Sequence, residues 1–359
     1  MSSLNTSEIQ KPFLKINDNS SYSALSEPDT THQLLSDLDS PPSNTPYIKR
    51  YQNQSLLYGI TFQSSSSPLT LALSTKNISL KNKITIIEFS PQEDKFIERS
   101  NSECEFPPSS ILFCPSSSNK DLLISTSDSL RIYKYSENKL TFQKEIKGNN
   151  KIYCGPLTSC DWSHINPSIV GVSSSDTTCK LWDITKLEIL NTLIVDDKSA
   201  YDINFGNDDF TFMTAGASGG IRLFDIRTPD TCKVLFDNGE PVTRVKGNLI
   251  NGNLVICCFL DKSVIYVLDK RKPDIPYAIL EGHTNVVNNA IWAPKSNTNV
   301  ISVGDDKMAL VWDVYSDYMP KCVMEYKANK EIENVSWGDA TDDWVGIIYG
   351  NIVEVLKMK

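Results

Sequence analysis

Residues 281–314 read EGHTNVVNNAIWAPKSNTNVISVGDDKMALVWDV, and this stretch decides the fold. It holds Gly282-His283, an apolar run ending at Trp292, an Asp-Asp pair at 305–306 and a further run ending in Trp312-Asp313. Apolar residues that alternate between tight turns are typical of short antiparallel strands. The stretch therefore predicts three consecutive strands joined by turns, with no helix to brace them.

Parts of this pattern recur along the chain. The equivalents of Trp312, near the end of each third strand, are placed at Ile87, Tyr133, Trp182, Phe224, Leu268, Trp312 and Glu354. The equivalents of Trp292, at the end of each first strand, are Phe62, Phe113, Trp162, Phe205, Gly247, Trp292 and Trp337, six of which are aromatic. Successive third-strand positions lie 42 to 49 residues apart, and a propeller blade takes about 40–45 residues. Seven positions predict seven blades.

The pattern resembles the WD repeat, whose four-stranded units assemble into a closed β-propeller. By that resemblance, His283 before the first strand, Ser302 on the second, Asp306 in the turn and Trp312 on the third form a buried, hydrogen-bonded tetrad. Such a chain of polar groups is stable only if every member has a partner. The predicted fold class is all-β: a seven-bladed WD40 β-propeller with a disordered N-terminal tail.

Composition sets the boundary between the two parts. Residues 1–45 are crowded with Ser, Thr, Asn, Asp and Pro and lack any alternation, which predicts the disordered tail. Residues 46–359 hold the propeller. Because the last blade has sequence for only three strands, we expect Tyr47–Tyr51 to supply its fourth strand and to close the ring.

Charge, hydropathy and cysteine content limit the possible cellular compartment and the possible partners. The formal net charge of −9 argues against nucleic acid as a direct ligand, and no apolar run approaches the ~20 residues of a membrane span. Nine cysteines without a disulfide spacing suit a reducing compartment, and the first residues do not resemble a secretory signal. We expect a monomeric propeller that works within complexes in the cytoplasm and nucleus.

Candidate catalytic and metal sites are weak. His283, Ser302 and Asp306 are the residue types of a hydrolytic triad, but each falls on a structural position of the repeat, and no Gly-x-Ser-x-Gly elbow surrounds the serine. The cysteines and the Asp-Asp pairs lack the spacing of zinc and calcium sites. No glycine-rich phosphate loop precedes a helix. The sequence predicts no catalytic residue, metal or cofactor.

Longer stretches carry a narrower resemblance. They include PLTSCDWSHINPSIVGVSSSDTTCKLWDI at 156–184 and ENVSWGDATDDWVGIIYGNIVEVLKM at 333–358, which are not generic WD-repeat sequence. From about Tyr47 to the C-terminus, the chain resembles the WD-repeat family of the plant transparent testa glabra regulator and the animal scaffold of dual-specificity tyrosine-regulated kinases. This resemblance implies a non-enzymatic scaffold for protein kinases, transcription regulators or cullin-4 ubiquitin ligases, in the last case as a substrate receptor.

Two other functions stay open at this point. One is a fixed structural subunit of a stable assembly, and the other is a propeller enzyme that uses the central channel. An enzyme requires convergent His, Asp or Lys side chains at the mouth of the channel, whereas a subunit has one stoichiometric complex instead of exchangeable clients.

One position in each blade marks a candidate partner-binding surface. Five residues after each equivalent of His283, where the loop passes into the first strand, stand Tyr58, Ser109, Thr158, Tyr201, Thr243, Asn288 and Glu333. The residues just before them are Leu57, Pro108, Leu157, Ala200, Val242, Val287 and Ile332. We hypothesise that the first set rings the top face, with Tyr58 and Tyr201 as anchors for a partner, and that the second set packs inward.

A second motif points to the opposite, bottom face. Two successive blades carry Asp-x-Arg after the third strand, as Asp225-Ile226-Arg227 and Asp269-Lys270-Arg271. Receptors for the cullin-4 adaptor often end a strand in this way, and each arginine presents a planar set of donors. We hypothesise that both pairs contact the adaptor. The alternative is that they are ordinary surface residues at a strand end.

Overall fold

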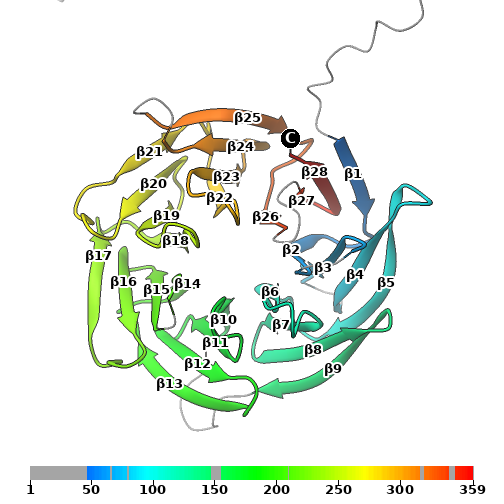
Figure 1. Cartoon of the computed structure of the whole chain (residues 1–359), viewed down its shortest axis with the longest axis horizontal. Helices are drawn as coiled ribbons and strands as arrows, with labels where there is room; N and C mark the ends of the chain where they lie inside the picture. Colours follow the sequence, from blue (N-terminus) through cyan, green and yellow to red (C-terminus); the bar gives the residue numbers. More distant parts are fainter. Residues whose placement is uncertain are drawn as a thin grey trace, which may run out of the picture. The chain divides into compact units, whose positions relative to one another are not determined.

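The computed structural model describes residues 47–64, 67–78, 81–146, 155–208, 210–315, 319–338 and 344–358 of the folded unit Thr45–Lys359. These residues form 28 strands and no helix. The strands make seven four-stranded antiparallel sheets arranged as the blades of a propeller (Figure 1). The predicted fold class is therefore confirmed for the described part of the chain. The predicted disordered tail lies outside it.

The first three blades each use four consecutive strands, ordered from the centre outward. Blade 1 consists of β2 (Leu57–Phe62), β3 (Thr70–Thr75), β4 (Asn82–Ser90) and β5 (Lys95–Cys104). Blade 2 consists of β6 (Ser110–Phe113), β7 (Leu122–Thr126), β8 (Leu130–Ser136) and β9 (Lys139–Ile146). Blade 3 consists of β10 (Leu157–Trp162), β11 (Ile169–Ser174), β12 (Thr178–Asp183) and β13 (Glu188–Ile194).

The other four blades continue the ring, and the last takes its outer strand from the start of the folded unit. Blade 4 consists of β14 (Ala200–Phe205), β15 (Thr211–Gly216), β16 (Gly220–Asp225) and β17 (Cys232–Asp237). Blade 5 consists of β18 (Val242–Gly247), β19 (Leu254–Phe259), β20 (Val264–Asp269) and β21 (Ala278–Glu281). Blade 6 consists of β22 (Val287–Trp292), β23 (Asn299–Gly304), β24 (Met308–Asp313) and β25 (Lys321–Lys327). Blade 7 consists of β26 (Asn334–Trp337), β27 (Trp344–Tyr349), β28 (Ile352–Lys357) and β1 (Tyr47–Gln52).

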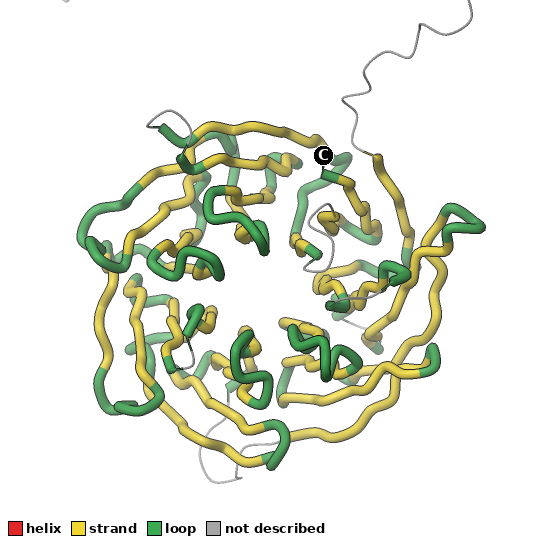
Figure 2. Tube along the Cα trace, viewed as in Figure 1, coloured by secondary structure: helices red, strands yellow, loops and turns green. Residues whose placement is uncertain are grey.

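The core lies between the blades, not inside any one of them. The inner strands follow one another around the centre (Figure 2), and each of seven apolar clusters combines residues from two adjacent blades. Each cluster contains one third-strand residue at the position equivalent to Trp312, and these are Ile87, Tyr133, Trp182, Phe224, Leu268, Trp312 and Leu356. A single blade therefore cannot bury its faces, and the blades are stable only as a ring.

Glu354 does not occupy the third-strand position that the spacing assigned to it. Leu356 pairs with Val345 as Trp312 pairs with Val300, so the equivalent residue lies two positions later. The spacing failed because it counts residues between blades, whereas the strand register sets which side chain faces the neighbouring blade. Glu354 is instead a fully buried carboxylate that accepts hydrogen bonds from Arg50 and from Tyr326.

The pairing of β1 with β28 joins the two ends of the propeller. Six residue pairs, from Tyr47 with Lys357 to Gln52 with Ile352, form an antiparallel ladder, and Figure 1 shows the two strands side by side. Arg50 Nε donates to Glu354 Oε1 at 2.9 Å across this ladder. Because β1 is the outermost strand of blade 7, its loss leaves β28 as an unpaired edge and the Glu354 carboxylate without its cation.

Two deletions test the contribution of β1. We expect removal of residues 1–40 to leave the melting temperature unchanged within about 2 °C, and removal through Tyr51 to lower it by more than about 5 °C. Thermal unfolding of the full chain and of both truncations, followed by circular dichroism, measures the difference. Equal melting temperatures for all three proteins would contradict a stabilising role for the β1–β28 ladder.

Candidate functional site

The top face, where the first strands begin, carries a ring of half-buried residues next to a fully buried ring. The seven residues predicted to surround this face are all partly exposed, and the residues just before them are all buried. In five blades the partly exposed residue is a β-bulge between the first and second strands: Tyr58, Thr158, Tyr201, Thr243 and Asn288. A bulge turns one side chain out of the ladder, which explains why these residues leave the sheet at this level.

Most of the polar members of this ring connect blades. Ser109 Oγ donates to the carbonyl of Leu157 at 2.8 Å, and Thr158 Oγ1 donates to that of Ala200 at 2.8 Å. Asn288 Nδ2 donates to the carbonyl of Ile332 at 2.9 Å. Thr243 bonds within its own blade, and Glu333 forms an ion pair with Lys76. These side chains hold the ring together, so their first role is structural.

The two tyrosines are less constrained. Tyr58 packs beside Lys76, whose Nζ lies 5.3 Å from the ring centroid, and its hydroxyl accepts a long hydrogen bond of 3.4 Å from Arg244 Nη2. Among the described residues, no hydrogen bond is formed by the Tyr201 side chain. In the predicted top-face set, Tyr58 and Tyr201 are thus the residues whose aromatic surface is left for contact with a partner.

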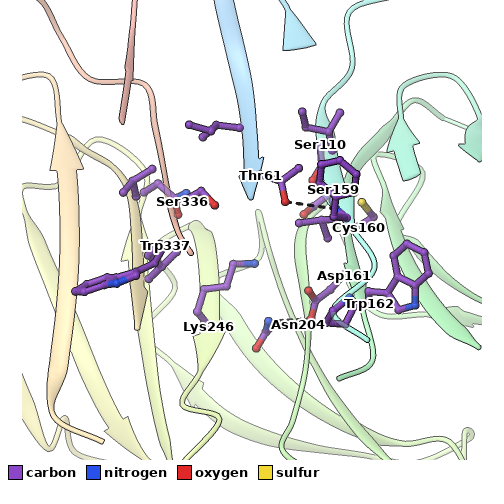
Figure 3. A pocket seen from close by; sticks show the side chains of 18 of the residues that line it. Thr61, Ser110, Ser159, Cys160, Asp161, Trp162, Asn204, Lys246, Ser336 and Trp337 are labelled. Atoms are coloured by element: carbon purple, nitrogen blue, oxygen red, sulfur yellow. Dashed lines mark hydrogen bonds between the residues drawn. The ribbon is translucent and has the colours of Figure 1, made fainter. Parts of the chain in front are cut away.

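The channel below this ring is a pocket of about 260 Å³ lined by the first strands of all seven blades. Polar residues at alternate positions of these strands point into it, and Lys246 extends into the space that Asp161, Asn204 and Trp337 also line (Figure 3). Lys246 Nζ lies 2.9 Å from Asp202 Oδ2 in an ion pair. Burial raises the pKa of the Asp161 carboxyl, and the charge of Lys246 opposes that shift.

The channel side chains also cap the inner edges of the sheets. Each first strand is an edge strand, and its free N–H groups need acceptors. Asp161 Oδ2 accepts from Phe205 N at 2.7 Å, Asp202 Oδ2 from Val245 N at 3.0 Å and Asn204 Oδ1 from Gly247 N at 2.8 Å. In each case the acceptor belongs to one blade and the donor to the next.

The sequence interpretation missed these channel residues. The pattern was present, because the first strands of blades 3 to 5 alternate polar residues with apolar ones, as at Asp202, Asn204, Arg244 and Lys246. The terminal aromatic residues that locate these strands in the sequence belong to the apolar clusters between blades. Five of them also line the pocket: Phe62, Phe113, Trp162, Trp292 and Trp337.

On the bottom face, the two Asp-x-Arg motifs adopt the same geometry. Arg227 Nε and Nη2 donate to the two oxygens of Asp225 at 2.9 and 2.5 Å, and Arg271 does the same to Asp269 at 2.9 and 2.6 Å. Both guanidinium groups remain largely exposed, at 60% and 68% of their side-chain surface. The Arg227 guanidinium lowers the pKa of the Asp225 carboxyl to about 2. Each arginine is therefore held in place before any partner binds.

Apolar side chains surround these arginines. The Arg227 guanidinium lies 4.2 Å from the centroid of the Phe210 ring. The ring centroids of Tyr277 and Tyr315 lie 5.5 Å apart. Further exposed apolar residues in the bottom loops of blades 5 and 6 are Ile250, Ile275 and Met319. A surface of aromatic residues and arginine is typical of the centre of a protein interface.

The four residues of the predicted tetrad form one continuous hydrogen-bonded chain. Trp312 Nε1 donates to Ser302 Oγ at 2.8 Å, Ser302 Oγ lies 2.7 Å from His283 Nε2, and His283 Nδ1 lies 2.8 Å from Asp306 Oδ2. Asp306 also accepts from the N–H groups of Thr284 and Met308 at 3.0 Å each. Ser302 has no exposed surface, so the triad-like order of these groups has no access to a substrate.

This chain of bonds fixes the protonation of His283. Ser302 Oγ accepts from the Trp312 indole, so its own proton needs an acceptor, which neutral His283 provides at Nε2. A protonated imidazole turns Nε2 into a donor and leaves the Ser302 proton without a partner. Burial lowers the pKa of His283, although the Asp306 carboxylate acts in the opposite direction. The imidazole is therefore neutral at physiological pH.

Blade 3 has the same tryptophan without the network. Trp182 pairs with Val170 as Trp312 pairs with Val300, and both indoles are buried. Val172 stands where blade 6 has Ser302, and Trp182 Nε1 has no hydrogen-bond partner among the described residues. The two tryptophans thus differ in one hydrogen bond while sharing their strand position.

Two observations on the described residues concern metal ligands and thiols. The described residues contain no group of three or more His, Cys, Asp or Glu placed to hold a metal ion. Burial raises the pKa of the channel-lining Cys160 to about 12, which keeps its thiol protonated. None of the described segments is a helix long and apolar enough to cross a membrane.

Comparison with known proteins agrees with this geometry. The model of the WD domain, G-beta repeat, matches residues 141–183 and 275–313. The chain is 31% identical over 322 residues to the DDB1- and CUL4-associated factor 7 homolog of Dictyostelium discoideum, a match that covers 87% of this chain and 98% of that protein. The chain belongs to the WD-repeat family.

Two yeast members of the WD-repeat family are also similar. A WD repeat-containing protein of Schizosaccharomyces pombe is 26% identical over 374 residues, covering 82% of this chain and 86% of that protein. One of Saccharomyces cerevisiae is 27% identical over 254 residues, covering 60% of this chain and 49% of that protein. The first two relatives thus match this WD-repeat chain over most of their own length.

The matched tryptophans of blades 3 and 6 give a direct test of the tetrad. Replacement of either by Phe removes similar volume, but only Trp312→Phe also removes a hydrogen bond. We expect Trp312→Phe to lower the free energy of unfolding by about 1–2 kcal/mol more than Trp182→Phe does. Denaturant titration of both variants and the parent measures the difference, and equal losses would show that the network adds nothing to stability.

Proposed function

We propose that this WD-repeat protein is a non-enzymatic scaffold that holds client proteins on its top face and contacts the cullin-4 adaptor with its bottom face. Its clients are protein kinases or transcription regulators, and it works in the cytoplasm and nucleus as a monomeric propeller within larger complexes. The observation that carries the proposal is the identical, preorganised geometry of Arg227 and Arg271 on neighbouring blades.

The bottom face supports an adaptor contact on physical grounds. Each arginine is held by the aspartate two residues earlier, so little side-chain entropy is lost when a partner binds. The equivalent turns of blades 3 and 6 lack the guanidinium: two residues after Asp183 stands Thr185, and two residues after Asp313 stands Tyr315. The name of the Dictyostelium relative associates that protein with DDB1 and CUL4, and the similarity supports the same association here.

The top face supports the binding of clients. It offers two aromatic side chains at bulges, Tyr58 and Tyr201, on a ring that is otherwise fixed by bonds between blades. Aromatic anchors on a rigid frame bind with small loss of conformational freedom. Because the adaptor binds the opposite face, one propeller holds a client and a ligase that do not compete for the same surface.

The adaptor contact is tested by changing both arginines. We expect Arg227→Ala with Arg271→Ala to weaken binding of the purified DDB1-type adaptor by about tenfold or more, measured by surface plasmon resonance on the full chain. Lys186→Ala is the matched control, because Lys186 is 68% exposed and pairs with Asp183 at the same turn of blade 3. An unchanged affinity in the double variant, or no binding to the parent, would remove the adaptor from the proposal.

The client surface is tested separately. We expect Tyr58→Ala and Tyr201→Ala each to weaken client binding by about 2 kcal/mol or more in free energy, measured by quantitative co-precipitation of kinases and transcription regulators from cells. Tyr277→Ala changes an exposed tyrosine of the bottom face and serves as the control. Clients that bind both top-face variants as well as the parent do not use this face.

A further inference from the structure

Arg244 is a cation at the mouth of the channel without a carboxylate partner among the described residues. Its Nη1 donates to the carbonyl of Thr243 at 3.0 Å, and its Nη2 donates to the Tyr58 hydroxyl at 3.4 Å. Tyr58 belongs to blade 1 and Arg244 to blade 5, so the second bond reaches across the channel. Arg244 as a whole residue is partly exposed.

The Asp202 carboxylate attracts the Arg244 guanidinium, but its ion pair is with Lys246. The Asp202 carboxylate on the adjacent blade already accepts from Ser159 Oγ, the N–H of Val245 and Lys246 Nζ. A guanidinium has five N–H donors in a planar fork that matches a carboxylate. Toward the described residues, Arg244 makes two donations, one of them long. A partly desolvated cation of this kind gains most from an incoming anion.

A second unused polar atom lines the same channel. Asn289 is 7% exposed, and its Oδ1 has no hydrogen-bond partner among the described residues. Its orientation is fixed, because Asn334 Nδ2 donates to the carbonyl of Tyr58 at 3.0 Å and so presents Oδ1 to Asn289 Nδ2, which donates at 2.7 Å. The free Asn289 oxygen therefore needs a donor such as a peptide N–H.

We propose that the mouth of the channel binds one acidic side chain from an extended segment of a client protein. Its carboxylate pairs with the Arg244 guanidinium, and a neighbouring peptide N–H donates to Asn289 Oδ1. The inference rests on the proposed scaffold function and names the chemistry that the top face recognises. Tyr58 stands beside the entering segment and supplies its aromatic anchor.

The structure favours one carboxylate over other ligands. Among the described residues that line the channel, Arg244 is the one arginine or lysine without an ion pair, and the nearby Asp202 carboxylate disfavours a dianionic phosphate. The pocket of about 260 Å³ is also smaller than the ~300–1,000 Å³ of sites for drug-sized molecules. A single inserted acidic side chain with its adjoining backbone fits both the charge and the volume of the channel mouth.

Peptide selection on the full chain tests this inference. A display library of random peptides is selected on the parent protein and on Arg244→Gln, and we expect only the parent to enrich peptides that share Asp or Glu at one aligned position. An enriched peptide is then synthesised with Glu and with Gln at that position. By fluorescence polarisation, we expect Glu→Gln in the peptide and Arg244→Gln in the protein each to weaken binding by about tenfold to a hundredfold, and the two together to cost no more than either alone.

The matched control is Arg99→Gln, which changes an arginine that pairs with Glu88 on the outer part of blade 1 and must bind like the parent. The comparison of Glu and Gln peptides on the parent protein keeps the test valid even if Arg244→Gln fails to fold. Three results overturn the inference: no enriched peptide, enriched peptides without a shared acid, or an acidic peptide that binds Arg244→Gln as tightly as the parent. A phosphoserine peptide that binds more tightly than the Glu peptide overturns the carboxylate assignment.

Failure of the proposed acidic contact can be distinguished from failure of the proposed scaffold function. Clients that co-precipitate with the parent and with Arg244→Gln alike, but are lost with Tyr58→Ala, leave the scaffold intact and remove only the acidic contact. If the parent co-precipitates neither kinases nor transcription regulators, the proposed function itself is wrong.

Discussion

The antiparallel ladder between β1 and β28 is the contact on which the rest of the propeller depends. Each apolar cluster is shared by two blades, so the ring has no complete core until its ends meet. The cluster at the junction combines Leu57 and Phe62 of blade 1 with Ile348 and Val355 of blade 7. Burial of these side chains and pairing of the last strand edge favour the same closed arrangement.

Closure creates a second requirement at the centre. Seven first strands face the channel with free N–H groups, and side chains such as Asp161, Asp202 and Asn204 supply acceptors from the neighbouring blade. Two channel groups differ from these acceptors. Among the described residues, Arg244 has no ion pair and Asn289 Oδ1 has no hydrogen-bond partner. In a buried polar network, an unused group is the place to look for a ligand.

The two faces position their exposed side chains in different ways. On the top face, bulges turn Tyr58 and Tyr201 out of the ladder above the channel. On the bottom face, Asp225 and Asp269 hold their arginines at fixed positions beside exposed aromatic rings. Both surfaces are built on a rigid frame, because bulges in the sheets place the backbone of the tyrosines and short turns hold the arginines. Rigidity of this kind suits a protein that holds others in a fixed relation.

The sequence by itself determined the repeat, because each blade is built from local strands and turns whose spacing is visible in the chain. The tetrad residues and the alternating positions of each first strand could be predicted in the same way, since turns and alternation along one strand are local properties. It misplaced Glu354, where the blade is assembled from both ends of the folded unit and register, not spacing, decides the facing residue. Only the tertiary structure decided that Tyr58 and Arg244, 186 residues apart, meet across one channel. That meeting exists only after the ring closes, and no local pattern encodes a contact between opposite blades.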